Sequence, residues 1–336
     1  MSTTNLPTTI RTLSQPDPNI PKVILTTSPL PALTPGSKTE HLIKVHATSP
    51  CADELIWPRN DPHLFSSTIV PCYDLSGTVI QAPSDSPFPP GTDIWCSTPP
   101  GRPGNGREYT IATTEELATR PKCIDAVTAA GVPLSAVTAV QALFVHGGIR
   151  GFRDGEEGKR ENATKKILVI AAAGGVGIWL LQLAREAGVG GIVAVCGTDN
   201  VGFVKELGAT EVIDYRKQSV EEFYSRNKNK RVDLVIDCKG GKSLEEAWSC
   251  VRQGGILLSI CEPPENRKPA GCTTQDIQSS FFILTARGSD LTDVSRLLEE
   301  GKVVPFVDSV WNLDDYEKAY ERVGEGHTRG KVIIVP

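Results

Sequence analysis

Residues 165–177 of the chain read Lys165-Lys166-Ile167-Leu168-Val169-Ile170-Ala171-Ala172-Ala173-Gly174-Gly175-Val176-Gly177. The apolar half predicts a β-strand over 167–171, and the small residues after it open a helix predicted over 174–187. A strand that turns through small residues straight into a helix is typical of α/β folds with parallel strands. One side of the predicted helix is apolar, with residues at helical spacing: Val176, Leu180, Leu183, Ala184 and Ala187.

The alternation of strand and helix continues beyond this turn. Further strands are predicted over 192–196, 211–214, 232–237 and 256–260. Helices are predicted between them, over 201–207, 220–226 and 244–251. Because helical crossovers join consecutive strands, we expect an α/β fold with a doubly wound parallel sheet of the Rossmann type.

The small side chains of the turn let backbone amides approach a negatively charged group closely. The N-terminus of the helix adds partial positive charge, so the turn can hold the pyrophosphate of a dinucleotide. The competing interpretation is a tight turn without a ligand, but the series of strand–helix units favours the dinucleotide. The residues predicted to contact the cofactor here are Ala172, Gly174, Gly175 and Val176.

The end of the second predicted strand bears on which dinucleotide is bound. NAD-binding folds place an acidic residue there to hold the ribose 2′-hydroxyl, but this strand ends in Cys196-Gly197-Thr198, without a carboxylate. A 2′-phosphate would not be repelled, and Thr198 could donate a hydrogen bond to it, so NADPH is the predicted cofactor. Asp199 argues for NADH. Tyr215 and Arg216 could close over the adenosine, although Tyr215 could equally be a half-buried aromatic at a strand end.

The first part of the chain differs in composition and in the pattern of its apolar residues. Residues 1–140 are dense in proline and glycine, and short apolar runs at 41–45, 78–80 and 93–96 predict strands of a mostly β domain. The charged, glycine-rich residues 147–166 predict an exposed loop.

The last part of the chain again resembles the first part in its sequence pattern. A strand over 303–307, a helix around 314–323 and a strand over 331–335 are predicted to pack back on the N-terminal domain. The predicted domains are therefore 1–140 completed by 302–336, and 141–301.

Composition limits the possible partners and compartment. The net charge of -5 among 336 residues gives no reason to expect nucleic acid. No apolar run approaches the roughly 18–20 residues that span a bilayer, and the N-terminus lacks the apolar core of a secretory signal. Nine cysteines without a Cys-x-x-Cys pair predict free thiols in a reducing compartment. We therefore expect a cytoplasmic protein that acts on a small molecule, with no membrane or nucleic-acid partner, and a homodimer as the commonest assembly.

Several motifs resemble those of the medium-chain dehydrogenases/reductases. The turn at 171–177 resembles their cofactor turn, and Pro133-Leu134-Ser135-Ala136-Val137-Thr138-Ala139 resembles a helix that contacts the cofactor. Stretches at 207–215, 235–241 and 329–332 are similar as well, so the resemblance covers nearly the whole chain from His41. Residues 52–58 and 71–77 resemble the quinone oxidoreductase and enoyl reductase branch.

The resemblance implies a GroES-like catalytic domain beside the Rossmann domain, with the substrate between them. It implies hydride transfer from NADPH to an activated C=C bond, as in an enone or enoyl group, or to a quinone. The complete set of cofactor contacts then includes residues after later strands and one from the 133–139 helix: Thr138, Ala172, Gly174, Gly175, Val176, Gly197, Thr198, Tyr215, Ile260 and Phe282.

The chain departs from the zinc alcohol dehydrogenases of this superfamily. Their catalytic zinc is held by a cysteine, a histidine and a second cysteine. Cys51 falls at the first position, but Tyr73 replaces the histidine and no cysteine lies near Pro133. A thiol and a phenol do not make a three-ligand site, so no metal is predicted. Members that use NADPH usually carry a lysine or arginine near Asp199, and this chain does not.

Without a metal, protein groups must supply the proton and stabilise charge on the substrate oxygen. The predicted catalytic residues are Tyr73, as a proton donor, and Asp53, which could orient substrate or water. Tyr73 could instead be a packing aromatic, Asp53 a helix-capping carboxylate, and Thr138 an ordinary helix-packing residue. Cys51 is interpreted as an inert residue. Two alternative functions stay open: a catalytically silent NADPH-binding scaffold and a zinc-type alcohol dehydrogenase.

Overall fold

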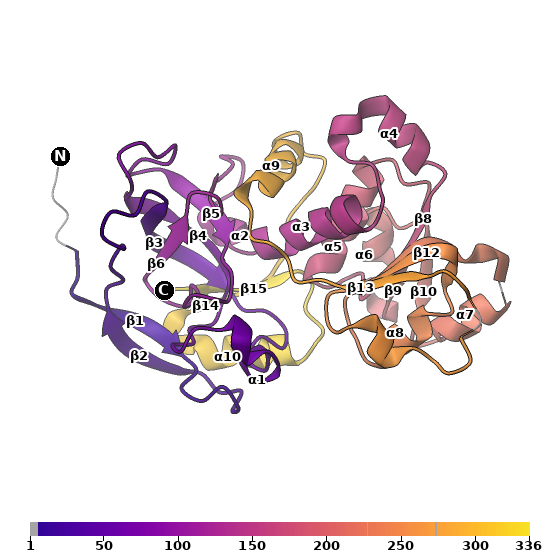
Figure 1. Ribbon diagram of the computed structural model, residues 1–336, viewed down its shortest axis with the longest axis horizontal. Helices are drawn as coiled ribbons and strands as arrows, with labels where there is room; N and C mark the ends of the chain where they lie inside the picture. The colour runs from indigo at the N-terminus through magenta and orange to yellow at the C-terminus, as the bar shows by residue number, and fades with distance from the viewer. Residues whose placement is uncertain (1–5, 227, 273) are drawn as a thin grey trace. The chain divides into compact units, whose positions relative to one another are not determined.

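The computed structural model describes residues 6–226, 228–272 and 274–336. The chain forms two compact units (Figure 1). Unit 1 consists of Met1–Leu134 and Thr285–Pro336, and unit 2 of Ser135–Leu284. From the composition of the sequence, the boundaries between the two domains were predicted at 140/141 and 301/302.

Unit 2 is built on a parallel sheet with the strand order β10-β9-β8-β11-β12-β13. From the central strand β8, the chain first adds strands on one side and then returns to add strands on the other, which is the doubly wound arrangement. The predicted fold class is therefore confirmed. The strands are β8 (Lys166–Ile170), β9 (Gly191–Cys196), β10 (Glu211–Asp214), β11 (Val232–Asp237), β12 (Val251–Ser259) and β13 (Gln278–Phe281).

The crossover helices begin close to their predicted positions. They are α5 (Gly175–Glu186), α6 (Val201–Glu206), α7 (Val220–Arg226) and α8 (Lys242–Ala247). The helix predicted over 244–251 is too long, because Val251 already pairs with Val232 in the sheet. Figure 1 shows α5 and α6 on the opposite side of the sheet from α8. Residues of α7 and α8, including Tyr224 and Trp248, pack on one face of the sheet in a buried apolar cluster.

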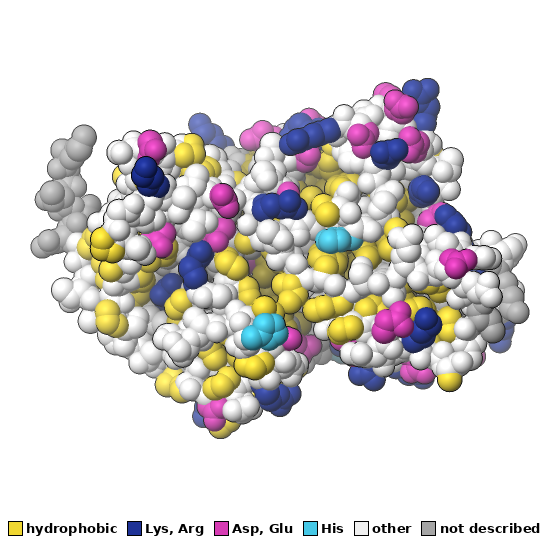
Figure 2. Space-filling model, in the orientation of Figure 1, with side chains coloured by type: hydrophobic (Ala, Val, Ile, Leu, Met, Phe, Trp, Pro, Cys, Tyr) yellow, Lys and Arg dark blue, Asp and Glu magenta, His cyan; other side chains and the backbone are white. Residues whose placement is uncertain are grey.

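The predicted exposed loop at 147–166 is wrong in one respect, because much of it is helical. Helix α4 (Gly155–Asn162) lies there, preceded by a short 3-10 turn at Phe152–Asp154. The buried Asn162 side chain accepts a hydrogen bond from the amide of Arg150 and donates to the carbonyls of Arg150 and Ala187. These bonds, together with the buried Ile149, tie a charged segment to the rest of unit 2. On the face shown in Figure 2, acidic and basic side chains lie interspersed over α4.

Unit 1 contains a sheet of order β14-β15-β3-β4-β5-β7, with β6 paired to β3. The C-terminal strands thus join the N-terminal ones, as predicted, and β15 agrees with the predicted 331–335. The strand predicted at 303–307 is wrong, because the strand lies at 307–312, where it pairs with β15. The strands of this sheet are β3 (Glu40–Ser49), β4 (Asp74–Gln81), β5 (Asp93–Ser97), β6 (Tyr109–Thr113), β7 (Ala118–Thr119), β14 (Val307–Asn312) and β15 (Lys331–Val335).

The remaining elements of the chain are a hairpin and short helices. Strands β1 (Thr9–Ser14) and β2 (Ile24–Pro29) form a separate antiparallel pair. The described residues include no helix with the length and apolar character needed to cross a bilayer. The helices not yet given are α1 (Trp57–Asn60), α2 (Ala126–Ala129), α3 (Pro133–Val140), α9 (Leu291–Glu299) and α10 (Tyr316–Gly324), with a π-helical turn at Gln141–His146.

Candidate functional site

The predicted phosphate-binding turn connects β8 to α5. Ala171 adopts a left-handed backbone conformation with φ of 60°, which reverses the chain directly after the strand. The Ala172 amide donates to the Val195 carbonyl at 3.0 Å, and the Gly174 amide donates to the Ala171 carbonyl at 3.0 Å. Because its amide is already paired and its side chain is buried, Ala172 shapes the turn and has no amide left for a phosphate.

The helix after the turn approaches the strand very closely. A Cβ atom on Gly177 would lie 2.5 Å from the Ala171 carbonyl oxygen and 2.6 Å from Ala172 Cα, so only glycine fits there. Gly174 is the N-cap of α5, no side chain caps it within the described chain, and the first turn carries no acidic residue. The half-buried Gly174, Gly175 and Val176 therefore open a helix whose N-terminus is suited to an anion.

The end of β9 receives a basic side chain from the end of β10. The guanidinium Nη1 of Arg216 lies 2.8 Å from Asp199 Oδ2, and the Tyr215 amide donates to the Cys196 carbonyl at 3.1 Å. A Cβ on Gly197 would lie 3.1 Å from Tyr215 Oη and 3.3 Å from Arg216 Nε. The basic group that the sequence lacks near Asp199 is therefore delivered there by the fold.

The hydroxyl of Thr198 was expected to donate to a 2′-phosphate, but it is already engaged. It donates to Asp214 Oδ2 at 2.7 Å, while the Arg216 amide donates to Asp214 Oδ1 at 3.1 Å. Asp214 thus ties the ends of β9 and β10 together. Tyr215 is half exposed, which leaves its ring open to a stacking partner.

The other predicted cofactor residues also follow parallel strands or lie on α3. Ile260 follows β12 and its amide donates to the Asp237 carbonyl at 3.1 Å, and Phe282 follows β13. Because the carboxyl ends of parallel strands lie at one edge of a sheet, the turn lies at the same edge as Gly197, Tyr215, Ile260 and Phe282. His146, which sequence reasoning missed, packs its ring 4.4 Å from that of Phe282. Thr138 is buried on α3.

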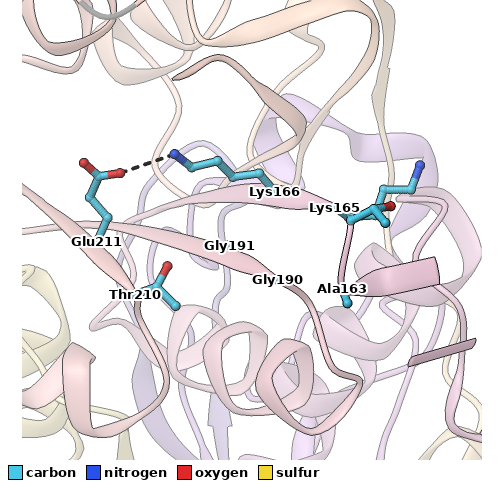
Figure 3. A pocket seen from close by; sticks show the side chains of 8 residues that line it. Ala163, Lys165, Lys166, Gly190, Gly191, Thr210 and Glu211 are labelled. Atoms are coloured by element: carbon cyan, nitrogen blue, oxygen red, sulfur yellow. Dashed lines mark hydrogen bonds and ion pairs between the residues drawn. The ribbon is translucent and has the colours of Figure 1, made fainter. Parts of the chain in front are cut away.

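A polar hollow lies at the opposite edge of the same sheet. It has a volume of about 540 Å³ and is lined by residues that precede β8, β9 and β10, together with the first residues of those strands. Figure 3 shows Lys166 reaching from β8 toward Glu211 on β10, an ion pair of 3.3 Å. Because the hollow lies at the amino ends of the strands, it is separate from the predicted cofactor turn.

Both predicted catalytic residues belong to unit 1: Asp53 lies in a loop at 51–57, and Tyr73 directly precedes β4. Tyr73 is only 3% exposed, and its ring centroid lies 6.2 Å from that of Trp57 and 6.4 Å from that of Phe65. Burial raises the pKa of Tyr73 well above its ordinary value, so the phenol stays protonated. Asp53 is exposed with φ of 61°. It is not a helix cap, because Ile56 holds the N-cap of α1.

A buried ammonium group that sequence reasoning missed lies beside these residues. Lys331, the first residue of β15, places Nζ 3.2 Å from Cys51 Sγ and 3.3 Å from Asp74 Oδ2. Asp74 is fully buried and accepts a hydrogen bond of 2.6 Å from the Leu134 amide. Burial alone would lower the pKa of Lys331, but Cys51 and Asp74 outweigh it and the pKa is raised. The only signal in the sequence was the 329–332 motif.

A second buried carboxyl group lies nearby. Glu54 is 2% exposed and accepts hydrogen bonds from Tyr320 Oη at 2.6 Å and from the Cys72 amide at 3.2 Å. Burial raises its pKa to about 7, although these two hydrogen bonds and Lys331 oppose the rise. Glu54 therefore changes its charge near neutral pH.

The side chains of unit 1 do not fit a catalytic zinc ion. The described residues contain no group of three or more His, Cys, Asp and Glu side chains that could hold a metal. The Lys331 ammonium lies next to Cys51, where its positive charge would oppose a divalent cation. A zinc-based step therefore has no support in this geometry.

One family model and several known proteins are similar to this chain. Residues 207–334 match the family model described as zinc-binding dehydrogenase. The chain is 43% identical to a probable zinc-binding oxidoreductase, mitochondrial, of Arthroderma benhamiae, over 99% of this chain and 98% of that one. It is 31% identical to the chloroplast envelope quinone oxidoreductase homolog of Arabidopsis thaliana, over 80% of each chain.

A third relative and a solved structure extend the comparison. The human NAD(P)H oxidoreductase RTN4IP1, mitochondrial, is 28% identical over 78% of this chain and 69% of that one. The quinone oxidoreductase structure from Coxiella burnetii shares the fold, with a TM-score of 0.81, 24% identity, and coverage of 98% of this chain and 99% of that one.

The expectation of a cytoplasmic protein is wrong. The Arthroderma benhamiae relative and the human one are both named as mitochondrial. The expectation failed because the lack of an apolar secretory signal speaks only against the secretory route and does not distinguish cytosol from organelle. With the fold, the motifs and these relatives in agreement, the chain belongs to the medium-chain dehydrogenase/reductase superfamily of oxidoreductases, in its quinone oxidoreductase-like branch.

Proposed function

We propose that the chain is an NADPH-dependent reductase that transfers hydride, without zinc, to a C=C bond conjugated with a carbonyl or to a quinone. The name NAD(P)H oxidoreductase carried by RTN4IP1 relatives supports a nicotinamide cofactor. The turn at 171–177 supports it independently, because the contact that Gly177 permits brings the N-terminus of α5 against the end of β8.

The observation that carries the choice of NADPH is the position of Arg216. Its guanidinium lies at the end of β9, 2.8 Å from Asp199, where the Rossmann fold holds the 2′ position of the adenosine ribose. A guanidinium binds phosphate oxygens with charge-assisted hydrogen bonds that a 2′-hydroxyl cannot match. Tyr215, half exposed beside it, is proposed to stack on the adenine.

The cofactor would supply the hydride, and the protein would supply binding, orientation and protons. The amides of Gly175 and Val176, at the start of α5, are proposed to hold the pyrophosphate, with Ile260, Phe282 and Thr138 beside the nicotinamide half. Gly174, whose amide donates to the Ala171 carbonyl, is proposed to shape the turn that lets the pyrophosphate approach. In unit 1, Asp53 remains the group proposed to orient substrate or water. Tyr73, predicted from the sequence as a proton donor, is here proposed only to orient the substrate, because its ring packs against Trp57 and Phe65. The absence of zinc chemistry is proposed because the ammonium of Lys331 lies against Cys51.

The first experiment measures binding and turnover of the purified protein. Calorimetry with NADPH and NADH gives the two dissociation constants, and loss of NADPH absorbance in the presence of an enone, an enoyl thioester or a quinone gives turnover. We expect NADPH to bind more tightly and at least one acceptor class to be reduced. Failure to bind any dinucleotide would contradict the proposal.

Arg216→Gln tests the cofactor choice. It removes a charged hydrogen-bond donor worth about 1.5–3 kcal/mol, so the NADPH dissociation constant is expected to rise roughly ten- to a hundredfold, with little change for NADH. Arg252→Gln is a matched control, since Arg252 has the same 47% exposure and also forms a 2.8 Å ion pair, with Asp233. Equal losses in both variants would show that Arg216 does not contact the phosphate.

Two other outcomes favour the alternative functions. Tight NADPH binding without oxidation across all acceptors favours a catalytically silent scaffold. About one zinc per chain by elemental analysis favours the zinc-type alcohol dehydrogenase, for which the names of the matched family model and the Arthroderma benhamiae relative are the supporting observation.

A further inference from the structure

Cys51 and Lys331 form a buried pair whose role the proposed function does not yet explain. The two residues are 280 positions apart, and Lys331 Nζ donates to Cys51 Sγ at 3.2 Å. Both side chains are more than nine-tenths buried. Burying an ammonium group costs several kcal/mol unless it is paired and hydrogen-bonded, and here Asp74 and Cys51 are its partners.

The surrounding structure holds the ammonium in this place. Asp74 Oδ2 lies 3.3 Å from Nζ, and Asp74, the first residue of β4, is itself fixed by the Leu134 amide. The stem of Lys331 passes over Gly131, where an added Cβ would lie 3.1 Å from Lys331 Cβ. The ammonium is therefore a positive charge directed at the Cys51 sulfur from β15, which is paired on both sides in the sheet.

We propose that Cys51 is the proton donor of the reduction and that Lys331 is the positioning residue that orients its sulfur and stabilises the thiolate. This assignment rests on the proposed function. Because Lys331 donates to the sulfur, the thiol hydrogen can point away from the ammonium. Cys51 is nearly buried but retains 8% exposure, and the exposed Asp53 lies on the same loop.

The step balances as a single proton transfer. When hydride has been added to the β-carbon, the π electrons of the C=C bond lie on the α-carbon and the carbonyl oxygen. The S–H bond of Cys51 breaks, its proton forms a C–H bond at the α-carbon, and the sulfur keeps the electron pair. The thiolate is neutralised by the Lys331 ammonium at 3.2 Å. A proton from water then restores the thiol.

A proton donor at this place must not react with its own substrates. Enones and quinones alkylate thiolates, and the thiolate is the reactive form of cysteine. Burial raises the pKa of Cys51 to about 12, with Glu54 and Asp74 raising it further and Lys331 opposing the rise. The resting sulfur therefore stays protonated, unreactive as a nucleophile yet able to give its proton to a carbanion. Cys72 and Tyr320 complete the titratable groups around Glu54.

Turnover with the best acceptor, together with NADPH binding, tests Cys51. Loss of a general acid costs about 10²–10⁴-fold, so Cys51→Ala is expected to lose at least a hundredfold in kcat while its NADPH dissociation constant is unchanged. Cys51→Ser keeps a hydroxyl donor and should recover part of the loss. Cys96→Ala, which removes another buried thiol of unit 1, should keep wild-type turnover.

Labelling of Cys51 in cofactor-free protein tests Lys331 without relying on activity. An adjacent cation lowers a thiol pKa by about 1–3 units, so Lys331→Met should slow iodoacetamide labelling of Cys51 at alkaline pH at least tenfold, measured by peptide mass spectrometry. Lys331→Arg should restore it. If Lys331 had only a structural role, Lys331→Met would loosen the packing around Cys51, and iodoacetamide would label Cys51 faster than in the wild type.

The outcomes separate this assignment from the proposed function. Wild-type protein that oxidises no NADPH overturns the proposed function and this assignment with it. Wild-type turnover in folded Cys51→Ala overturns the assignment of Cys51 alone. If Cys51→Ala does not fold, wild-type turnover in Cys51→Val, which fills the same space without a proton donor, overturns the assignment of Cys51 in the same way. Labelling of Lys331→Met at or above the wild-type rate, or no labelling of the wild type, overturns the role of Lys331.

Discussion

Glu54 couples the stability of unit 1 to pH. Its carboxyl group is buried with a pKa raised to about 7, above the ordinary 4.5 of an unfolded chain, mainly by burial. Below pH 4.5 the carboxyl group of Glu54 is protonated in both the folded and the unfolded state, so its ionisation does not lower the free energy of unfolding. Between about pH 4.5 and 7 the unfolded chain ionises first, so stability is lost as the pH rises.

Glu54→Gln removes this titration and isolates its effect. At about 1.4 kcal/mol per pH unit, the free energy of unfolding of the variant relative to wild type should rise by on the order of 3 kcal/mol between pH 4.5 and 8. Urea unfolding at several pH values measures the difference. A difference that stays constant with pH would show that Glu54 is not a buried titrating group.

Asp199 is expected to weaken NADPH binding by competing for Arg216. The two side chains form a largely exposed ion pair of 2.8 Å, and such pairs contribute about 0–1 kcal/mol. Asp199→Asn should therefore tighten NADPH binding up to about fivefold, while NADH, which would lose an acceptor for its 2′-hydroxyl, binds more weakly. Fluorescence titration with both cofactors gives the ratio. An unchanged ratio would place the 2′ position elsewhere.

At the scale of elements, the junction of β8 and α5 depends on the missing side chain of Gly177. An added Cβ would lie 2.5–2.6 Å from backbone atoms of Ala171 and Ala172, and backbone cannot yield as a flexible side chain can. Gly177→Ala should lose about 1–3 kcal/mol of stability and weaken NADPH binding by shifting the helix N-terminus. Thermal unfolding and calorimetry report the two effects.

Gly202→Ala is the matched control for that substitution. Gly202 lies inside α6, and a Cβ there would meet nothing within 4 Å. Alanine inside a helix is favoured over glycine by about 0.5–1 kcal/mol, so this variant should be slightly more stable and bind NADPH normally. Similar destabilisation by both substitutions would contradict the close-contact argument.

At the scale of the whole molecule, unit 1 depends on the last residues of the chain. Strand β15 lies between β14 and β3 and brings in Lys331. A chain ending at Gly330 should therefore fail to form the sheet of unit 1, whereas one ending at Val335 should fold. Circular dichroism and solubility distinguish the two. A folded chain ending at Gly330 would show that β15 is dispensable.

Local pattern was sufficient for much of unit 2. The strands around 167–170, 192–196 and 232–237 and the helix after the turn follow from apolar periodicity over a few neighbouring residues. The same pattern located the turn that we predict to hold the cofactor. Helix α4 was not predicted. Its last residue, Asn162, is held by side-chain hydrogen bonds to the carbonyls of Arg150 and Ala187. No periodicity within a charged segment reports such bonds.

The class of fold, the superfamily and the turn expected to hold the cofactor could be predicted, since each depends on residues adjacent in the chain. Which charged side chains meet could not be predicted, because it depends on how distant segments pack. The tertiary structure brought Arg216 to Asp199 across the ends of two strands, and Lys331 to Cys51 across 280 residues. Electrostatic contacts act through distances of a few ångströms in space, and the packing of the whole sheet sets those distances.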